Sequence, residues 1–277
     1  MHMDVFNWVF AGLLGLAVGS FLNVVIHRLP RMLEAQWAAE MHGLDSAEPT
    51  PKAAPYNLAF PASHCPHCGY TLRWTDNIPV LSYLHLRGQC RQCHTPISWR
   101  YPLVELLTGA LFVWSVTQYG VSVQALAWAG FAAVLVALAA IDADTTLLPD
   151  ALTQPLVWAG LVAASLHWSA QSLTNALWGA VAGYLFLWSV YWLFKWFTGK
   201  DGMGQGDFKL LAALGAWLGW PALVSLVLIA SITGVVAGLI LRMRGRLDKG
   251  GYIPFGPFLA FAGLWVMAFG PLPTVHL

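Results

Sequence analysis

The stretch ALAWAGFAAVLVALAAIDADTTLLPD (125–150) decides the fold of this chain. Its first part, from Ala125 to Ile141, consists of apolar residues and one glycine, and Asp142 ends it. A helix that crosses the roughly 30 Å hydrocarbon core of a bilayer needs about 20 mostly apolar residues. The sequence therefore predicts a membrane-spanning helix over 123–141, with acidic residues at its end.

The composition of the whole chain agrees with this prediction. The 277 residues are 58% apolar and 10% charged, with a mean hydropathy of +0.61, whereas soluble domains carry about 25% charged residues. This excludes an ordinary soluble enzyme, a disordered protein and a disulfide-rich secreted domain. We expect an all-α polytopic membrane protein with about eight transmembrane helices, over residues 5–26, 101–118, 123–141, 151–167, 173–194, 208–220, 222–241 and 255–270.

The basic residues predict the orientation in the bilayer. All 14 Lys and Arg residues lie in the segments 28–100, 195–209 and 242–249. With eight spans these segments share one side of the membrane, which is the cytoplasm by the positive-inside rule. The net charge of +1 gives no indication of nucleic acid, and no nucleic-acid partner is expected.

The same pattern predicts the domain organisation. The start of the chain has no basic n-region and no cleavage site, so residues 1–27 are expected to remain as the first transmembrane helix. Residues 28–100 form a small cytoplasmic domain, and residues 101–277 form a seven-helix membrane core.

The cytoplasmic segment contains two CxxC pairs, CPHC (65–68) and CRQC (90–93). Each pair can supply two thiolates to one tetrahedral ion, so the spacing indicates a zinc site. Four thiolates leave no open coordination position, which favours a structural zinc ion. The alternative, two disulfides, requires an oxidising compartment, and the basic residues place the segment in the cytosol. The expected ligands are Cys65, Cys68, Cys90 and Cys93.

Two acidic stretches lie at the cytoplasmic ends of predicted spans, IDADTTLLPD (141–150) and GMGQGDFK (202–209). Carboxylates at the edge of the hydrocarbon are costly and suggest a function. Both stretches lie at one membrane face, so Asp142 and Asp207 can meet. Two close carboxylates do not readily ionise together, so one acts as a base and the other as an acid. Such a pair activates water for attack on a peptide carbonyl. Gly204 and Gly206 are expected to form the active-site loop.

The helix ends predict which aspartate acts as the base and which carries the shared proton. Asp207 begins a helix, where the dipole favours the anion, and Asp142 ends one. The expectation is that Asp207 is the resting base and that Asp142 carries the shared proton. Asp144 is a rival to Asp142. Glu105 either pairs with Arg100 at the membrane edge or lies near the site.

These segments resemble, in order, those of the bacterial type IV prepilin peptidases (leader peptidase and N-methyltransferase), which are GxGD-type membrane aspartic proteases. In that family the catalytic aspartates are the first Asp of D-x6-P-D and the Asp of GxGD, which correspond to Asp142 and Asp207. Besides the two CxxC pairs and the two acidic stretches, the resemblance rests on GSFLNVVIHRLP (19–30), RYPLVELLTG (100–109), GMGQGDFKLLAALGAWLG (202–219) and IPFGPFLAFAG (253–263).

The resemblance implies a function for the whole chain. Family members cleave the basic leader of type IV prepilins and of the pseudopilins of type II secretion. The cut follows a Gly at the cytoplasmic face of the bacterial inner membrane. They then methylate the new N-terminal residue, commonly Phe, using S-adenosylmethionine. No residue pattern in the sequence locates the cofactor site.

Two other classes of function remain open at this point. An ion-coupled transporter would use intramembrane carboxylates to relay charge, but the Asp residues lie at the membrane boundary and the spans show no internal repeat. A non-catalytic assembly factor for pili or secretion would use zinc for docking and the aspartates as helix caps.

Overall fold

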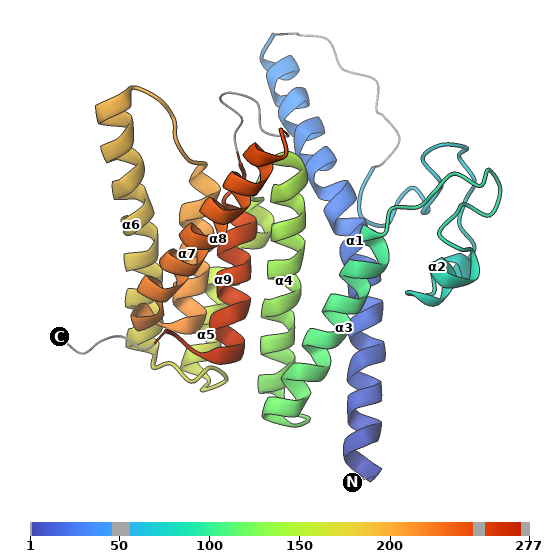
Figure 1. Cartoon of the computed structure of the whole chain (residues 1–277), viewed down its shortest axis with the longest axis horizontal. Helices are drawn as coiled ribbons and strands as arrows, with labels where there is room; N and C mark the ends of the chain where they lie inside the picture. Colours follow the sequence, from blue (N-terminus) through green and yellow to red (C-terminus); the bar gives the residue numbers. More distant parts are fainter. Residues whose placement is uncertain (1, 46–55, 246–252, 273–277) are drawn as a thin grey trace. The chain divides into compact units, whose positions relative to one another are not determined.

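The computed structural model describes residues 2–45, 56–245 and 253–272 (Figure 1). Over this part of the chain the regular elements are α-helices and two short 3-10 helices, and β-structure is limited to two isolated bridges. The all-α prediction is therefore confirmed. Each of the predicted apolar stretches coincides with one of the helices α1 and α3–α9. The chain divides into two compact units, Met1–Ala129 and Gly130–Leu277, which are described separately.

The first unit pairs α1 (His2–Asp45) with α3 (Arg100–Tyr119). The two helices touch at glycines: a Cβ on Gly15 would lie 2.8 Å from Gly109 Cα, and one on Gly19 would lie 2.7 Å from Glu105 Cα. Small residues let helix backbones approach in this way where no hydrophobic force drives association. The loop between the helices carries the short elements η1 (Trp74–Asn77) and α2 (Leu81–His85).

Helix α1 does not end with the apolar stretch at residue 26. It continues to Asp45 with Pro30 inside it. The residues that follow Pro30, such as Met32, Leu33 and Glu34, favour helix, so the loss of one backbone hydrogen bond at the proline does not end it.

The second unit is built around α7 (Gln205–Leu218). Every residue of α7 from Leu210 to Leu218 is buried, because helices on several sides cover it. A helix that is apolar on all faces is expected to lie in the interior. Around it in Figure 1 lie α4 (Val123–Thr145), α5 (Asp150–Ser165), α6 (Leu173–Thr198), η2 (Trp220–Ala222), α8 (Leu223–Met243) and α9 (Gly256–Phe269).

The closest helix contact of this unit joins α6 and α7. A Cβ on Gly179 would collide with the carbonyl of Gly215, and a Cβ on Gly215 would collide with the carbonyl of Gly179. The two backbones therefore touch directly. This contact fixes the position of α7, and with it the acidic residue in the first turn of that helix.

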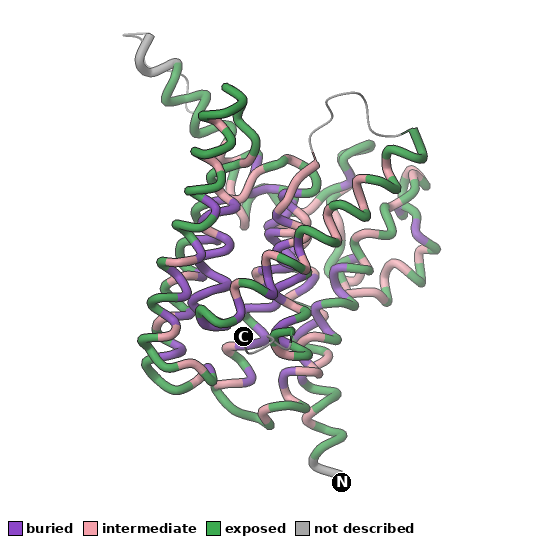
Figure 2. Tube along the Cα trace, turned by 60° about the vertical axis from the view of Figure 1, so that its left-hand side comes forward, coloured by how far each residue is buried: buried purple, intermediate pink, exposed green. Residues whose placement is uncertain are grey.

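The helix surfaces fit a lipid environment. Four of the described helical segments are long and apolar enough to cross a membrane: Asp4–Met41, Val123–Thr145, Leu173–Thr198 and Trp220–Met243. Within Trp220–Met243 an 18-residue window has a mean hydropathy of 2.6, yet only 17% of that window is buried. Figure 2 shows exposed residues, in green, interspersed with pink and purple ones along the helices. Soluble proteins rarely expose apolar surface on this scale. The chain is a membrane protein, and crossing by the four shorter helices, α3, α5, α7 and α9, stays a prediction.

Candidate functional site

Asp142 lies near the end of α4 and is only 4% exposed. The backbone N–H of Gly256, the first residue of α9, donates a hydrogen bond of 2.9 Å to Asp142 Oδ2. A Cβ on Gly256 would lie 2.5 Å from the same oxygen, so only glycine allows this approach. The N-terminal end of α9 thus faces the carboxylate and stabilises negative charge on it.

Asp207 lies in the first turn of α7 and is 3% exposed. Gly204 is the N-cap of that helix, and its backbone interacts with the Asp207 carboxylate. The carboxylate oxygen Oδ1 of Asp207 is buried and has no hydrogen-bond partner among the described residues. Burying a polar atom without a partner costs free energy, so such an atom indicates a group that binds something else.

Leu148, in the turn that follows α4, packs against both the start of α7 and the start of α9. A Cβ on Gly206 would lie 2.6 Å from Leu148 Cβ, and one on Gly256 would lie 3.2 Å from Leu148 Cδ1. The starts of α7 and α9 therefore meet on one side chain, and the charge of Asp142 acts on Asp207. The structure brings together the two aspartates that the sequence analysis paired.

The neighbouring acidic residues differ from this pair in burial. Asp144 is exposed, because two positions along a helix turn a side chain to the opposite face. Asp150 forms a salt bridge of 2.6 Å with Lys209, and Asp201 forms one of 2.8 Å with Lys195. These three acids lie on the surface.

Gly256 is a site residue for which the sequence reasoning assigned no role. It lies in the stretch IPFGPF (253–258), and Pro257 follows it directly. Proline in the first turn marks the start of a helix, so the pair Gly-Pro before an apolar run indicated a helix N-terminus. No local pattern indicated what this N-terminus faces.

The four cysteines form a second site, in the first unit. None of them is disulfide-bonded, and their Sγ atoms all lie within 4.8 Å of one another. Two Sγ–Sγ distances join the two motifs: Cys65 to Cys93 at 3.8 Å and Cys68 to Cys90 at 3.9 Å. A tetrahedral zinc ion with Zn–S bonds of about 2.3 Å requires sulfur separations of about 3.8 Å. The cluster therefore fits such an ion.

The two CxxC motifs form the same turn. The carbonyl of Cys65 accepts a hydrogen bond from the N–H of Gly69, and the carbonyl of Cys90 accepts one from the N–H of His94. Gly69 and His94 both have a left-handed backbone, with φ of 71° and 56°. Glycine adopts this conformation without strain, and histidine is enriched there among the other residues. Each turn points two thiols to the same side.

An ion pair between exposed Arg91 and buried Asp76 supports the cysteine cluster. The guanidinium of Arg91, inside the second CxxC motif, contacts Asp76 Oδ1 at 2.6 Å, and the N–H of Arg73 and the hydroxyl of Tyr70 donate to Asp76 Oδ2. Burial alone would raise the pKa of Asp76, but these hydrogen bonds and the charge of Arg91 hold the pKa below its ordinary value. The ion pair therefore connects the segment after the first CxxC motif with the second CxxC motif.

The fold and the two sites together define a helical membrane protein with a buried aspartate pair and a four-cysteine cluster that can hold a metal ion. Residues 13–119 match the bacterial peptidase A24 N-terminal domain, and residues 129–239 match the type IV leader peptidase family. No solved structure matches the chain significantly.

Curated relatives cover most of the chain, and the three described here are each named prepilin leader peptidase/N-methyltransferase. The protein of Burkholderia pseudomallei strain 1026b is 53% identical over 263 residues, which are 94% of this chain and 85% of the relative. The protein of Pseudomonas aeruginosa PAO1 is 52% identical over 254 residues, 92% and 87% of the two chains. That of Aeromonas hydrophila is 52% identical over 262 residues, 94% and 89%. The chain belongs to the type IV leader peptidase family.

Proposed function

We propose that this protein is a prepilin leader peptidase and N-methyltransferase, with Asp142 and Asp207 as the catalytic residues. The observation that carries the peptidase proposal is the burial of these two carboxylates at neighbouring helix ends, where the charge of one acts on the other. Family membership and the names of the relatives support the same reaction.

In the proposed mechanism the pair shares one proton. The N–H of Gly256 stabilises the anion of Asp142, and the unpartnered Oδ1 of Asp207 suits a carboxyl group that carries the proton. Asp142 then takes a proton from water, the water oxygen attacks the peptide carbonyl carbon, and Asp207 donates its proton to the carbonyl oxygen. When the C–N bond breaks, the leaving amine takes up a proton from the pair.

This assignment reverses the roles expected from the sequence, which gave the base to Asp207. That expectation followed only from the helix to which each residue belongs. Asp142 ends α4, but it also faces the start of α9, and that second helix end favours its negative charge.

The proposed substrates are type IV prepilins and the pseudopilins of type II secretion. In this proposal the basic leader stays on the cytoplasmic side of the bacterial inner membrane, and the peptide bond after its final Gly reaches the aspartates at that face. The confinement of the Lys and Arg residues to three segments supports this orientation. Zinc would be held by the four cysteines as a structural ion, and S-adenosylmethionine supplies the methyl group when it is bound.

The test is cleavage of a synthetic prepilin peptide with a Gly–Phe junction by the purified protein in detergent. Asp142→Asn and Asp207→Asn should each lower the rate by at least about 100-fold, because each removes one proton-transfer group. Asp144→Asn is the matched control, since its carboxylate is exposed on the same helix. Cleavage at the wild-type rate by either of the first two variants would exclude the aspartate mechanism. An assembly factor or a transporter would cleave nothing.

A further inference from the structure

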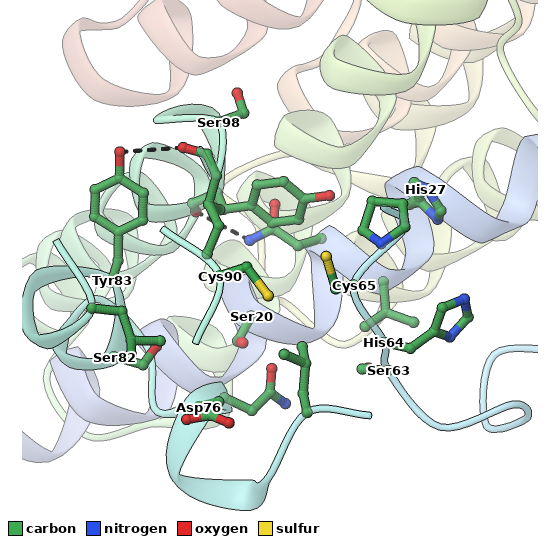
Figure 3. A pocket seen from close by; sticks show the side chains of 18 of the residues that line it. Ser20, His27, Ser63, His64, Cys65, Asp76, Ser82, Tyr83, Cys90 and Ser98 are labelled. Carbon is green, nitrogen blue, oxygen red and sulfur yellow. Dashed lines mark hydrogen bonds between the residues drawn. The ribbon is translucent and has the colours of Figure 1, made fainter. Parts of the chain in front are cut away.

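The short helix α2 exposes two large apolar side chains in a segment that hydropathy alone places outside the membrane. Leu81 and Leu84 lie one turn apart on the same face of α2, and each is 65% exposed. The opposite face, with Ser82 and Tyr83, lines a cavity of about 490 Å³ (Figure 3). The hydroxyl of Tyr83 donates a hydrogen bond of 3.4 Å to the carbonyl of Ile97, so this inner face is attached to the chain just before α3.

The contact between α1 and α3 gives the depth at which α2 begins. Helix α1 is long and apolar enough to cross a membrane, and its apolar run ends at Ile26. Gly19 lies inside that run, about 10 Å from Ile26 at a rise of 1.5 Å per residue. A Cβ on Gly19 would lie 2.7 Å from Glu105 Cα, so the two residues share one depth.

The side chain of Glu105 connects this depth with α2. Its carboxylate accepts a hydrogen bond of 2.7 Å from the N–H of Val80, the residue directly before α2. Because a Glu side chain extends only a few ångströms, Val80 lies beside the apolar run of α1 and not beyond its end. Figure 1 shows α2 level with the first turns of α3. The exposed face of α2 therefore lies at the depth of the membrane.

The backbone of this segment meets the condition for contact with lipid, which is that its polar groups bond within the protein. The N–H groups of Ser82, Leu84 and Leu86 each donate to a carbonyl four residues earlier, and the N–H of Val80 donates to Glu105. Val80 has a φ of 60°, a left-handed backbone that is strained for a β-branched residue. The bond to Glu105 holds this strained residue, and α2 after it, at a fixed depth.

We propose that α2 lies in the membrane interface and anchors the cysteine-containing loop, residues 56–98, to the bilayer. A side chain at this depth that the protein leaves exposed contacts lipid, as does Leu106, which is 53% exposed beside Glu105. The partner of α2 is therefore phospholipid, with acyl chains on Leu81 and Leu84. Arg87 follows α2 and is exposed, and its long side chain can hold its charge at the phosphate layer. The inference does not depend on the proposed peptidase activity.

A photoactivatable phospholipid with a diazirine in its acyl chain tests the proposal. The wild-type, full-length protein is placed in vesicles of phosphatidylethanolamine and phosphatidylglycerol, irradiated and digested for mass spectrometry. Label on Leu81 and Leu84 should exceed that on Trp37 and Met41 at least about tenfold. The latter two residues are also apolar and exposed, but on α1 they lie more than about 15 Å beyond Ile26. Absence of label over 80–87 in vesicles in which α8 is labelled overturns the proposal, including the case in which a second copy of the chain covers this face.

Amide hydrogen exchange in the same vesicles gives a second measurement. Leu84→Glu should speed exchange over 80–87 at least about tenfold, because a carboxylate at this depth must leave the hydrocarbon and takes α2 with it. Leu84→Met, which is apolar and of similar volume, should keep the wild-type rates. Met41→Glu, at an exposed position of α1 outside the bilayer, should leave exchange in its own segment unchanged. In water, a change at a side chain that is 65% exposed affects stability little, so equal exchange in wild type and Leu84→Glu overturns the proposal.

Discussion

The backbone N–H of Gly256 donates a hydrogen bond of 2.9 Å to the carboxylate of Asp142, although 114 positions separate the two residues in sequence. The bond holds the end of α4 against the start of α9, and Leu148 packs on the same glycine and on Gly206 at the start of α7. The position of one carboxylate thus depends on three helix ends. A change at any of them should move it.

Gly256→Ala tests this dependence directly. The new methyl group would lie about 2.5 Å from Asp142 Oδ2, so the carboxylate or the start of α9 must shift. A misplacement of about 1 Å can reduce a rate about 100-fold, and we expect a loss of that order in the initial rate of leader cleavage. Gly130→Ala is the control, because a Cβ at Gly130 in α4 meets no atom within 4 Å. A wild-type rate in Gly256→Ala would show that the hydrogen bond does not position Asp142.

The shared proton predicts the shape of the pH–rate profile. At low pH both Asp142 and Asp207 are protonated and no base remains, and at high pH both are ionised and no acid remains. Leader cleavage should therefore fall on both sides of an optimum, measured as kcat/KM on the synthetic peptide. Asp144→Asn should keep both limbs, since its carboxylate is exposed and outside the pair. A rate that is constant over several pH units would contradict a shared proton.

The predictable part of the fold followed from local patterns. Long apolar runs placed the helices, and the two CxxC motifs indicated the four-cysteine cluster that the structure forms. The continuation of α1 through Pro30 to Asp45 did not follow from hydropathy, because the residues beyond the apolar run mix charged residues with apolar helix formers such as Met32 and Leu33. Hydropathy shows where a membrane span ends, not where its helix ends.

The part of the site that the sequence did not predict depends on contacts between distant segments. Position at a membrane face was enough to pair Asp142 with Asp207. The donor to Asp142 belongs to α9, and no local pattern links Gly256 to that carboxylate. Glu105 accepts a hydrogen bond from the N–H of Val80, 25 positions earlier in the sequence, and no local pattern predicts this contact.

Removal of the metal should affect the first unit most. A loop of this size has little apolar surface to bury, so we expect its folding to depend on an ion held by the four cysteines. Chelation should therefore speed amide exchange over 56–98. Cleavage of the leader peptide should fall less. Added zinc should restore the exchange protection, and slow exchange over 56–98 after complete metal removal would contradict a structural role.

Asp76→Asn should destabilise the same loop without removing a metal ligand. The change replaces a buried carboxylate that Arg91 contacts at 2.6 Å with a neutral amide. Hydrogen bonds to charged groups contribute about 1.5–3 kcal/mol, and we expect a loss of that order in the free energy of opening, measured by amide exchange over 56–98. Asp201→Asn, the same substitution in an exposed ion pair, should have little effect on the stability of its own segment.

The pH dependence of this effect follows from the lowered pKa of Asp76. A carboxylate whose pKa is lower in the folded than in the unfolded state stabilises fully at any pH above its unfolded value, about 3.9. The stabilisation is lost only as the pH falls through the lower folded-state pKa. The difference in opening free energy between wild type and Asp76→Asn should therefore be equal at pH 6 and pH 8. A difference that shrinks between pH 8 and pH 6 would show that Arg91 does not hold Asp76 in its ionised form.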